Sequence, residues 1–362
     1  MKDQANQDCA EEDIPIITPV SKVAAVEKQQ EIPKKIFNST TAETPTNADQ
    51  QPESTSTCQG CGGVQQAENA VEYFGAISCG SGVDNVRDSI EKVSVIEGVI
   101  SELLRVASWN ICQFSIRKTG RKDTLKRIAK IIDEFDIVAI QEVRDEEVLD
   151  ALIEKYLPEW GYTHSPPSNQ SGYIEYLAFM YRLDSVEVVE PGPYFDDEAS
   201  AFSRQPIACT FQATKLPELK LTLVNVHLPA KSKNALEEVA GFDQALTQLA
   251  GEMANNGKLC VLGDFNLSAL EAGPGMGKQM AALIYPLQTT IFGKRFDEIW
   301  LDKNGFTAGS TPRYLLYSGV LQIDEIHYRD SNRTMVTRQM EQEFKNEVSD
   351  HLPVWAAFRA VQ

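Results

Sequence analysis

The feature that most constrains the fold of this 362-residue chain is an alternation, from residue 103 onward, of short apolar segments with longer amphipathic ones. In DTLKRIAKIIDEF (123–135), the Leu, Ile and Phe residues fall on one helical face, and Asp123 is placed to cap the first turn. KLCVLGDF (258–265) is instead short and apolar, which is typical of a buried strand. The other predicted elements are helices at 145–157 and 235–256, and strands at 103–110, 136–142, 176–182, 207–211, 219–228, 297–301 and 353–358. This order predicts an α/β domain of two packed sheets with helices outside.

The first 85 residues have a different composition, rich in Gln, Glu, Thr, Ser, Pro and Asn, as in NSTTAETPTNADQQPESTST (38–57). Such a segment buries too little apolar surface to offset the entropy lost on ordering, so we expect a disordered acidic and polar region at 1–85. Residues 86–103 carry apolar residues near helical spacing, which predicts a short leading helix. The folded domain is then expected over residues 104–362.

The cysteines bear on the compartment. Seven cysteines at irregular spacings in a long chain favour free thiols, and the acidic amino terminus shows no basic and apolar leader, so we expect a cytoplasmic or nuclear location. Cys58 and Cys61, with Cys79 and the distant Cys9, offer four thiolates for a zinc site. The wide separation of the fourth cysteine and the lack of histidine in this region favour free thiols in a flexible tail instead.

Charge and hydropathy limit the partners. The net charge of −18 argues against indiscriminate binding of polyanions, and no run of about 18 apolar residues exists that would predict membrane insertion. Six basic groups nevertheless lie within residues 117–127, Lys231 and Lys233 follow one strand, and Lys294 and Arg295 precede another. Segments that leave the same ends of the strands should lie on one face of the sheets, so these positive charges would be concentrated where phosphate binds. The alternative is an ordinary solvated charge distribution.

Polar residues recur at the ends of the predicted strands. Each of them on its own is accounted for as a strand cap or the start of a turn. Together they assemble carboxylates, carboxamides and histidines at one rim of a sheet, the groups needed for Mg²⁺-assisted attack on a phosphate ester. The residues in question are Asn110, Glu142, His227, Asp264, Asn266, Asp350 and His351.

The same segments carry a family resemblance. In chain order, ASWNI, IVAIQEV, LVNVHLP, VLGDFN, RFDEIW and VSDHLPV resemble the motif series of the endonuclease/exonuclease/phosphatase superfamily over residues 104–360. Within it, GYIEYLAFMYR and FSRQP are most similar to the deoxyribonuclease I-like branch. The resemblance implies a four-layer αββα sandwich of two mixed sheets for the catalytic domain at 104–362, and a divalent-metal phosphodiesterase activity with DNA as the substrate.

The chemistry of these residue types suggests roles. Glu142 and Asp264, assisted by Asp350, are the carboxylates best suited to hold Mg²⁺, with Mn²⁺ or Ca²⁺ as alternatives. His351 would take a proton from the attacking water, and His227 would protonate the leaving oxygen. The two asparagines, Asn110 and Asn266, would donate amide hydrogens to phosphoryl oxygens in the transition state.

Further residues follow from the family pattern. It implies that Asp297 orients His351 and that Glu175 orients His227, and it matches Tyr173 and Arg204 to positions that contact substrate phosphate. Two segments fit the motif that carries the aspartate behind His351: RFDEIW (295–300) and QIDEIHY (322–328). Asp324 therefore stays as an alternative to Asp297. The aromatic residue before Asp297 and the strand-like residues after it favour Asp297.

Three functions remain open from the sequence. A metal-dependent nuclease that cuts DNA is favoured. A phosphatase or phosphodiesterase acting on phosphoinositides, sphingomyelin or other small phosphoesters is the alternative, although the chain lacks the Trp-Cys-Asp-Arg pattern usual in inositol-polyphosphate phosphatases. A non-catalytic binding module would predict loss of the motif residues, and all of them are present.

Overall fold

The computed structural model describes residues 77–79, 103–120, 123–170, 173–194, 202–243, 246, 258–306, 313–324 and 337–361. The leading helix predicted at 86–103, nearly all of the region predicted to be disordered, and the cysteines Cys9, Cys58 and Cys61 lie outside these residues. Ile77–Cys79 is an exception within the predicted tail, because it forms a strand, β1, that pairs in parallel with β13.

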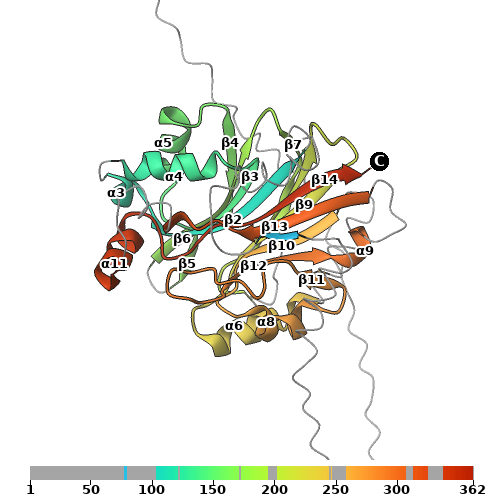
Figure 1. Ribbon diagram of the computed structural model, residues 1–362. Helices are drawn as coiled ribbons and strands as arrows, with labels where there is room; N and C mark the ends of the chain where they lie inside the picture. The colour runs from blue at the N-terminus through green and yellow to red at the C-terminus, as the bar shows by residue number, and fades with distance from the viewer. Residues whose placement is uncertain are drawn as a thin grey trace, which may run out of the picture. The chain divides into compact units, whose positions relative to one another are not determined.

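The first sheet has eight strands in the order β1-β13-β14-β2-β3-β6-β4, with β5 paired to β6 (Figure 1). It is mixed, because β2 and β3 are parallel while β14 and β6 run antiparallel to their neighbours β2 and β3. Its strands are β1 (Ile77–Cys79), β2 (Leu104–Phe114), β3 (Ile137–Val143), β4 (Trp160–His164), β5 (Ser168–Gln170), β6 (Tyr173–Arg182), β13 (Arg313–Val320) and β14 (Val354–Val361).

The second sheet has six strands in the order β11-β12-β10-β9-β8-β7. Here β9 and β10 are parallel, and the remaining pairs are antiparallel. The strands are β7 (Val186–Tyr194), β8 (Ile207–Ala213), β9 (Lys220–His227), β10 (Lys258–Asp264), β11 (Met280–Ala282) and β12 (Asp297–Asp302).

Helices cover the outer faces of both sheets, with one group on each side in Figure 1. The first sheet is covered by α3 (Ile116–Thr119), α4 (Thr124–Ile132), α5 (Glu147–Lys155) and α11 (Arg338–Glu347). The second is covered by α6 (Ser232–Val239) and α8 (Ala269–Met276), and the short α9 (Lys303–Phe306) follows β12. The four-layer αββα sandwich is therefore confirmed.

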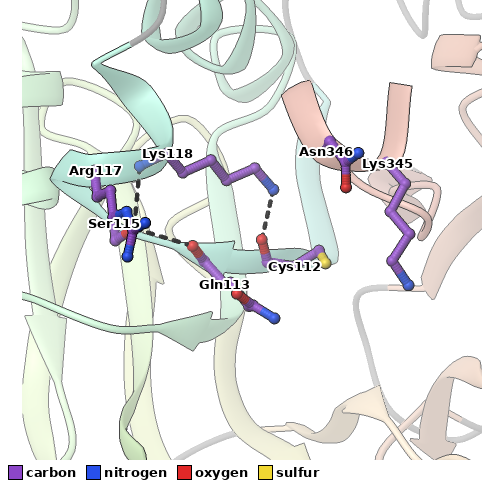
Figure 2. A pocket seen from close by; sticks show the side chains of 7 residues that line it. All are labelled: Cys112, Gln113, Ser115, Arg117, Lys118, Lys345 and Asn346. Carbon is purple, nitrogen blue, oxygen red and sulfur yellow. Dashed lines mark hydrogen bonds between the residues drawn. The ribbon is translucent and has the colours of Figure 1, made fainter. Parts of the chain in front are cut away.

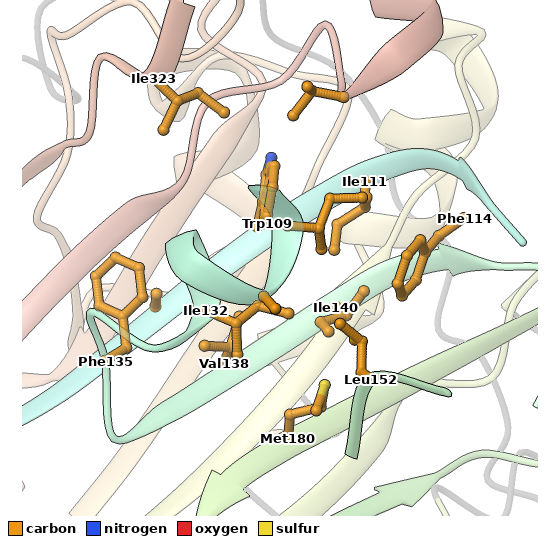
Figure 3. Close-up of a cluster of buried hydrophobic side chains, with 14 of the residues drawn as sticks. Trp109, Ile111, Phe114, Ile132, Phe135, Val138, Ile140, Leu152, Met180 and Ile323 are labelled. Atoms are coloured by element: carbon orange, nitrogen blue, oxygen red, sulfur yellow. The ribbon is translucent and has the colours of Figure 1, made fainter. Parts of the chain in front are cut away.

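Three apolar clusters hold these layers together. One lies between the first sheet and its helices and includes Trp109, Phe114 and Ile132 (Figure 3). A second lies between the two sheets, and a third lies between the second sheet and its helices. Because alternate residues of a strand face opposite sides, the strands of both sheets bury side chains in two of these clusters.

Some local predictions were wrong. The helix predicted as one piece at 235–256 is interrupted, since α6 ends at Val239 and a turn follows. Gly275 of α8 meets this end so closely that an added Cβ would lie 2.3 Å from the Val239 carbonyl oxygen. Asp123 does precede α4, but its side chain makes no capping hydrogen bond and its backbone is left-handed, with φ of 69°.

Candidate active site

Strand register in the second sheet places three polar residues side by side. Asp264 ends β10, and it lies opposite His227 of β9 and opposite Asp297 of β12. The residue before it, Gly263, has φ of +154°, and a Cβ there would lie 2.0 Å from the Val226 carbonyl oxygen. Only glycine therefore fits where β10 delivers Asp264 beside β9.

Asp297 is paired with His351, which lies in the segment just before β14 of the other sheet. His351 Nδ1 lies 3.0 and 2.9 Å from the two carboxylate oxygens of Asp297, and both side chains are buried. Burial raises the pKa of Asp297. Burial alone would lower the pKa of His351, but the charges of Asp297 and Asp264 outweigh it and raise that pKa.

In a second histidine–carboxylate pair, the histidine comes from the second sheet and the carboxylate from the first. His227 Nδ1, on the second sheet, is hydrogen-bonded to Glu175 Oε1 on β6 of the first. Arg204 Nε donates to the other Glu175 oxygen at 2.8 Å. Although burial opposes it, the charges of His227 and Arg204 lower the pKa of Glu175 to about 2. Burial alone would lower the pKa of His227, but Glu175 raises it.

The two pairs converge on Asp264, which is 1% exposed. His227 Nε2 lies 3.5 Å and His351 Nε2 lies 3.7 Å from the same oxygen, Asp264 Oδ2. Asn110 Nδ2 also donates to this oxygen, at 3.0 Å. The other oxygen, Oδ1, accepts from the backbone N–H of Asn266 at 2.9 Å. Four of the residues selected from the sequence thus meet around the carboxylate of a fifth, Asp264.

Glu142 lies next to this group. Asn110 Nδ2 donates to both Asp264 and Glu142, and it lies 3.2 Å from Glu142 Oε1. The Asn110 amide oxygen accepts from the Cys112 N–H, which turns the amide nitrogen toward the two carboxylates. Glu142 Oε2 accepts from the Gln113 N–H at 2.8 Å and from Arg144 at 3.3 Å. Burial would raise the pKa of Glu142, but the charge of His227 and the Gln113 N–H lower it.

The backbone around these residues is strained. Four residues have left-handed φ values although none is glycine: Cys112 at 36°, Gln113 at 54°, Glu142 at 61° and Asn266 at 51°. Such conformations cost on the order of 1–3 kcal/mol each, and they concentrate at functional sites. Here all four lie at the ends of β2, β3 and β10, where the predicted motifs are.

Asp350 is paired with a lysine. Its Oδ2 lies 2.5 Å from the amino group of Lys345 on α11. Burial would raise the pKa of Asp350, but the charges of His351 and Lys345 lower it. If Asp350 assists in binding a cation, part of its negative charge is already offset by Lys345.

The donor set fits a divalent cation. Among the described residues, Asp264, Asp297 and His351 have ligand atoms within 4.8 Å of one another. Both Asp297 oxygens already face His351 Nδ1, so Asp264 and the neighbouring Glu142 are the carboxylates better placed to take a cation. Two carboxylates with amide neighbours suit Mg²⁺, which keeps several of its waters. The neighbouring carboxylates raise the pKa of both His227 and His351, which indicates an excess of negative charge at this site.

Other predicted residues have different surroundings. Asp324 lines a cavity with Arg295 and Leu352, and the described contacts of His351 Nδ1 are to Asp297 instead. Tyr173 begins β6, but its side chain is outside the described part of the chain. His164 ends β4, and its Nδ1 lies 2.8 Å from the backbone oxygen of Ser165.

Ser108, Gln141 and Asn225 have structural contacts. Gln141 Nε2 donates to Asn225 Oδ1 at 2.7 Å and to Ser108 Oγ at 3.1 Å, and Asn225 Nδ2 donates to two backbone carbonyls of the first sheet. This buried network joins the sheets beneath the site.

Three supporting residues were not singled out from the sequence. Ser349 Oγ donates to the Asn110 carbonyl at 2.6 Å and accepts from the His351 N–H at 3.0 Å, so it ties two motifs together. Arg144 lies 3.3 Å from Glu142 and 3.8 Å from Glu175. Lys345 holds Asp350. Ser349 and Arg144 lie within or directly after recognised motifs, which was the available signal, whereas Lys345 had none.

A sandwich whose two histidine–carboxylate pairs converge on a further buried carboxylate defines a hydrolase of phosphoester bonds. More specifically, the chain belongs to the endonuclease/exonuclease/phosphatase family, whose model matches residues 107–351.

Individual relatives agree with this assignment. A protein named Deoxyribonuclease from Thioalkalivibrio sp. (strain K90mix) is 28% identical over 276 residues, which are 70% of this chain and 71% of that protein. Deoxyribonuclease-1-like 2 of Mus musculus is 32% identical over 170 residues, 45% of this chain and 59% of that protein. This chain therefore spans less than two thirds of the mouse relative.

Solved structures show the same fold. Humanized D. rerio TDP2 with 14 mutations has a TM-score of 0.51 at 17% identity, covering 72% of this chain and 100% of that one. A family protein from Bacteroides thetaiotaomicron has a TM-score of 0.50 at 18% identity, covering 71% and 97%. Among the helices described in this chain, none is both long and apolar enough to cross a membrane.

Proposed function

We propose that this chain is a divalent-metal-dependent endonuclease that cleaves DNA phosphodiesters. The observation that carries the proposal is the approach of His227 Nε2 and His351 Nε2 to one oxygen of Asp264, each imidazole being held from behind by a carboxylate. The choice of DNA is supported by the deoxyribonuclease names of the relatives. The location we propose is cytoplasmic or nuclear, with which the free thiols Cys112 and Cys260 are compatible.

Glu142 and Asp264 would hold the cation, with Asp350 assisting. Mg²⁺ is the ion best matched to this set, and Mn²⁺ or Ca²⁺ are alternatives. When bound, the cation neutralises charge that builds on the phosphoryl oxygens. Without it, the carboxylates of the site would repel the substrate phosphate.

Proton transfer falls to the two histidines. His351 Nε2 takes a proton from water as the water oxygen bonds to phosphorus, while Asp297 keeps the other ring proton on Nδ1. For this step, the charge of Asp264 that helps to raise the pKa of His351 has to be offset by the cation that Asp264 would hold. As the bond from phosphorus to the leaving oxygen breaks, His227 Nε2 gives that oxygen a proton. The raised pKa of His227, which Glu175 causes, keeps this proton available near neutral pH. Each histidine thus has one direction of transfer.

The remaining residues position charge. Asn110 and Asn266 would donate amide hydrogens to phosphoryl oxygens, and Asn266 is held in place because its Nδ2 donates to the Leu228 carbonyl at 2.9 Å. Arg204 and Tyr173 are the proposed contacts to substrate phosphate. Arg204 has a second task, because its Nε holds Glu175 behind His227.

A substrate panel tests the proposal. With Mg²⁺, the protein is incubated with supercoiled plasmid, single-stranded DNA, abasic duplex, RNA and inositol phosphates, and a parallel series contains excess chelator. Nicking of plasmid by the wild type, its loss in chelator and its loss in His351→Ala are expected. Tyr156→Ala, at an exposed aromatic residue just after α5, is the control. Release of phosphate from inositol phosphates without DNA cleavage would favour the alternative function.

A further inference from the structure

A cavity of about 380 Å³ opens beside the reactive carboxylates and is lined largely by cationic and amide groups (Figure 2). Its lining residues are Cys112, Gln113, Ser115, Arg117, Lys118, Lys345 and Asn346. Two of these touch the site directly: the Gln113 N–H donates to Glu142, and the Lys345 amino group binds Asp350. The cavity therefore adjoins the acidic residues at which the proposed cleavage would take place.

The positive charge in this cavity is held by the fold. Lys118 Nζ donates to the backbone carbonyls of Ile111 and Cys112, at 2.8 and 2.5 Å, and thereby braces the left-handed end of β2. Lys345 is fixed by Asp350, and in Figure 2 Cys112 lies between the two lysine amino groups. Arg117 is exposed at the rim. Although Asp350 offsets part of the charge of Lys345, the lining contains three cationic residues and no acidic one, which suits a phosphate group.

An exposed aromatic ring adjoins the cavity. Phe292 is 46% exposed, and Lys345 Nζ lies 5.9 Å from the centre of its ring. The loop that carries the ring is tied to the catalytic segment, because the Ile291 N–H donates to the Asp350 carbonyl at 2.9 Å and Thr290 pairs with His351. Gly293, with φ of 77°, provides the turn directly after the ring. The ring is thus presented to solvent from a fixed position.

We propose that this cavity and Phe292 together form a subsite for an unpaired nucleotide next to the scissile phosphate, with its phosphate among Arg117, Lys118 and Lys345 and its base stacked on Phe292. A base stacks on an aromatic ring only through its face, so the nucleotide has to be unpaired or displaced from the duplex. The proposal rests on the proposed nuclease function and names the substrate form that the site prefers.

Binding measured with Mg²⁺ present, in the inactive His351→Ala background, separates this subsite from catalysis. The probes are a fluorescein-labelled single-stranded DNA octanucleotide and an octamer with the same phosphates but abasic sugars, followed by fluorescence anisotropy. Phe292→Ala is expected to weaken binding of the base-bearing probe at least about fivefold, since stacking on one base contributes that much or more, and to leave the abasic probe unchanged. Tyr156→Ala is the aromatic control and should affect neither.

The phosphate part is tested with Arg117→Gln, and Lys130→Gln, at an exposed position on α4, is the control. Arg117→Gln should weaken both probes equally and reduce the slope of log Kd against log salt by about 0.7, the value for one phosphate contact on a single strand. Equal losses on both probes for Phe292→Ala, or equal behaviour of the two charge variants, would overturn the subsite. Plasmid nicking by the same substitutions in the otherwise wild-type protein reports separately on the nuclease function.

Discussion

Asp264 Oδ2 is approached by three side chains from three strands or loops, and no other described carboxylate oxygen has two histidines facing it. A single acidic residue at the end of β10 therefore sets the positions of Asn110, His227 and His351. A substitution of Asp264 would therefore change the contacts of all three residues at once. Substituting a carboxylate that orients one histidine, such as Asp297, tests the role of that histidine more selectively.

Asp297→Asn is expected to lower the rate by several orders of magnitude while the fold stays intact. An asparagine keeps the shape but no longer stabilises the imidazolium of His351, and the comparable substitution in an unrelated protease costs about 10⁴-fold. The pH–rate profiles of Asp297→Asn and of Asp324→Asn, as the matched variant, provide the measurement. A crippled Asp324→Asn with a normal Asp297→Asn would reverse the assignment of the two aspartates.

Glu142→Gln is expected to raise the Mg²⁺ concentration for half-maximal activity at least about tenfold, because even indirect partners of a metal ligand contribute 10–100-fold to affinity. Calorimetric titration with Mg²⁺ supplies a readout that does not depend on turnover. Glu147→Gln, at an exposed acid in the first turn of α5, is the control. Unchanged affinity in Glu142→Gln would remove Glu142 from the proposed ligand set.

The residues at strand ends were predictable because a polar side chain directly after an apolar run is unusual locally. Asn110, Glu142 and Asp264 were selected in this way, and His351 was selected because it lies just before a predicted strand. Lys345 could not be, since its importance arises from the packing of α11 beside Asp350, 5 residues further along the chain and after the helix has ended. The order of the motifs along the chain was enough to predict the residues at the strand ends, whereas residues such as Lys345 become apparent only from tertiary contacts.

At the scale of elements, β12 is attached to its neighbours by a buried acid. Glu298 accepts backbone hydrogen bonds from Leu283, Ile284, Tyr285 and Ile299, at 2.7 to 3.0 Å. Burial raises the pKa of Glu298 to about 7. The residue before it is Asp297, so this attachment also fixes the carboxylate behind His351.

Glu298→Gln is expected to lower the melting temperature by several degrees. The amide nitrogen would replace Oε2, which accepts from the Tyr285 N–H, and an unsatisfied buried donor costs about 1–3 kcal/mol. Because the folded-state pKa lies above the ordinary value, the contribution of Glu298 is complete at low pH and decreases as pH rises toward about 7. Thermal scans at several pH values should therefore show the deficit of the variant shrinking as pH rises.

The exposed acid Glu187, on β7, provides the control substitution Glu187→Gln, which should leave the melting temperature nearly unchanged. A deficit in Glu298→Gln that grows with pH would contradict a raised pKa of the Glu298 carboxyl in the folded protein. Activity measured well below the melting temperature should stay close to normal if Asp297 keeps its position.

Elements differed in how well they could be predicted. The helix at α4 and the strands β2, β3, β9 and β10 have strong apolar patterns, and each was found. Strands β1, β4, β5, β7, β11 and β13 were missed. All of these except β13 are short or lie at an edge, where strand formation depends on pairing partners more than on the local sequence. The break after α6 depends on α8, which the local pattern of 235–256 does not contain.

At the scale of the whole molecule, two truncations separate the polar segment from the sheet. Removing residues 1–76 should preserve thermal stability and activity, because that segment lacks a core-forming pattern. Removing residues 1–85 also deletes β1 and exposes the backbone edge of β13, so a lower melting temperature is expected. Differential scanning calorimetry of both truncated proteins beside the full chain gives the comparison. Equal melting temperatures for all three would show that β1 contributes nothing.

The layered architecture was predictable as a whole, since buried strands and amphipathic helices alternate over more than 200 residues in an order that few folds accommodate. What composition could not reveal is where charge concentrates. A chain with a net charge of −18 nevertheless places Arg117, Lys118 and Lys345 around one cavity beside its carboxylates. Such local reversal comes from the fold and not from the overall balance.

Each histidine–carboxylate pair takes one member from each sheet: His227 with Glu175, and His351 with Asp297. A newly made chain in which the two sheets have formed but have not yet docked therefore contains no complete pair. Partly folded forms of a chain of this size are expected during synthesis. The proposed hydrolytic chemistry would begin only at the last docking step, so immature chains would be inert toward nucleic acid and the appearance of activity would report closure of the sandwich.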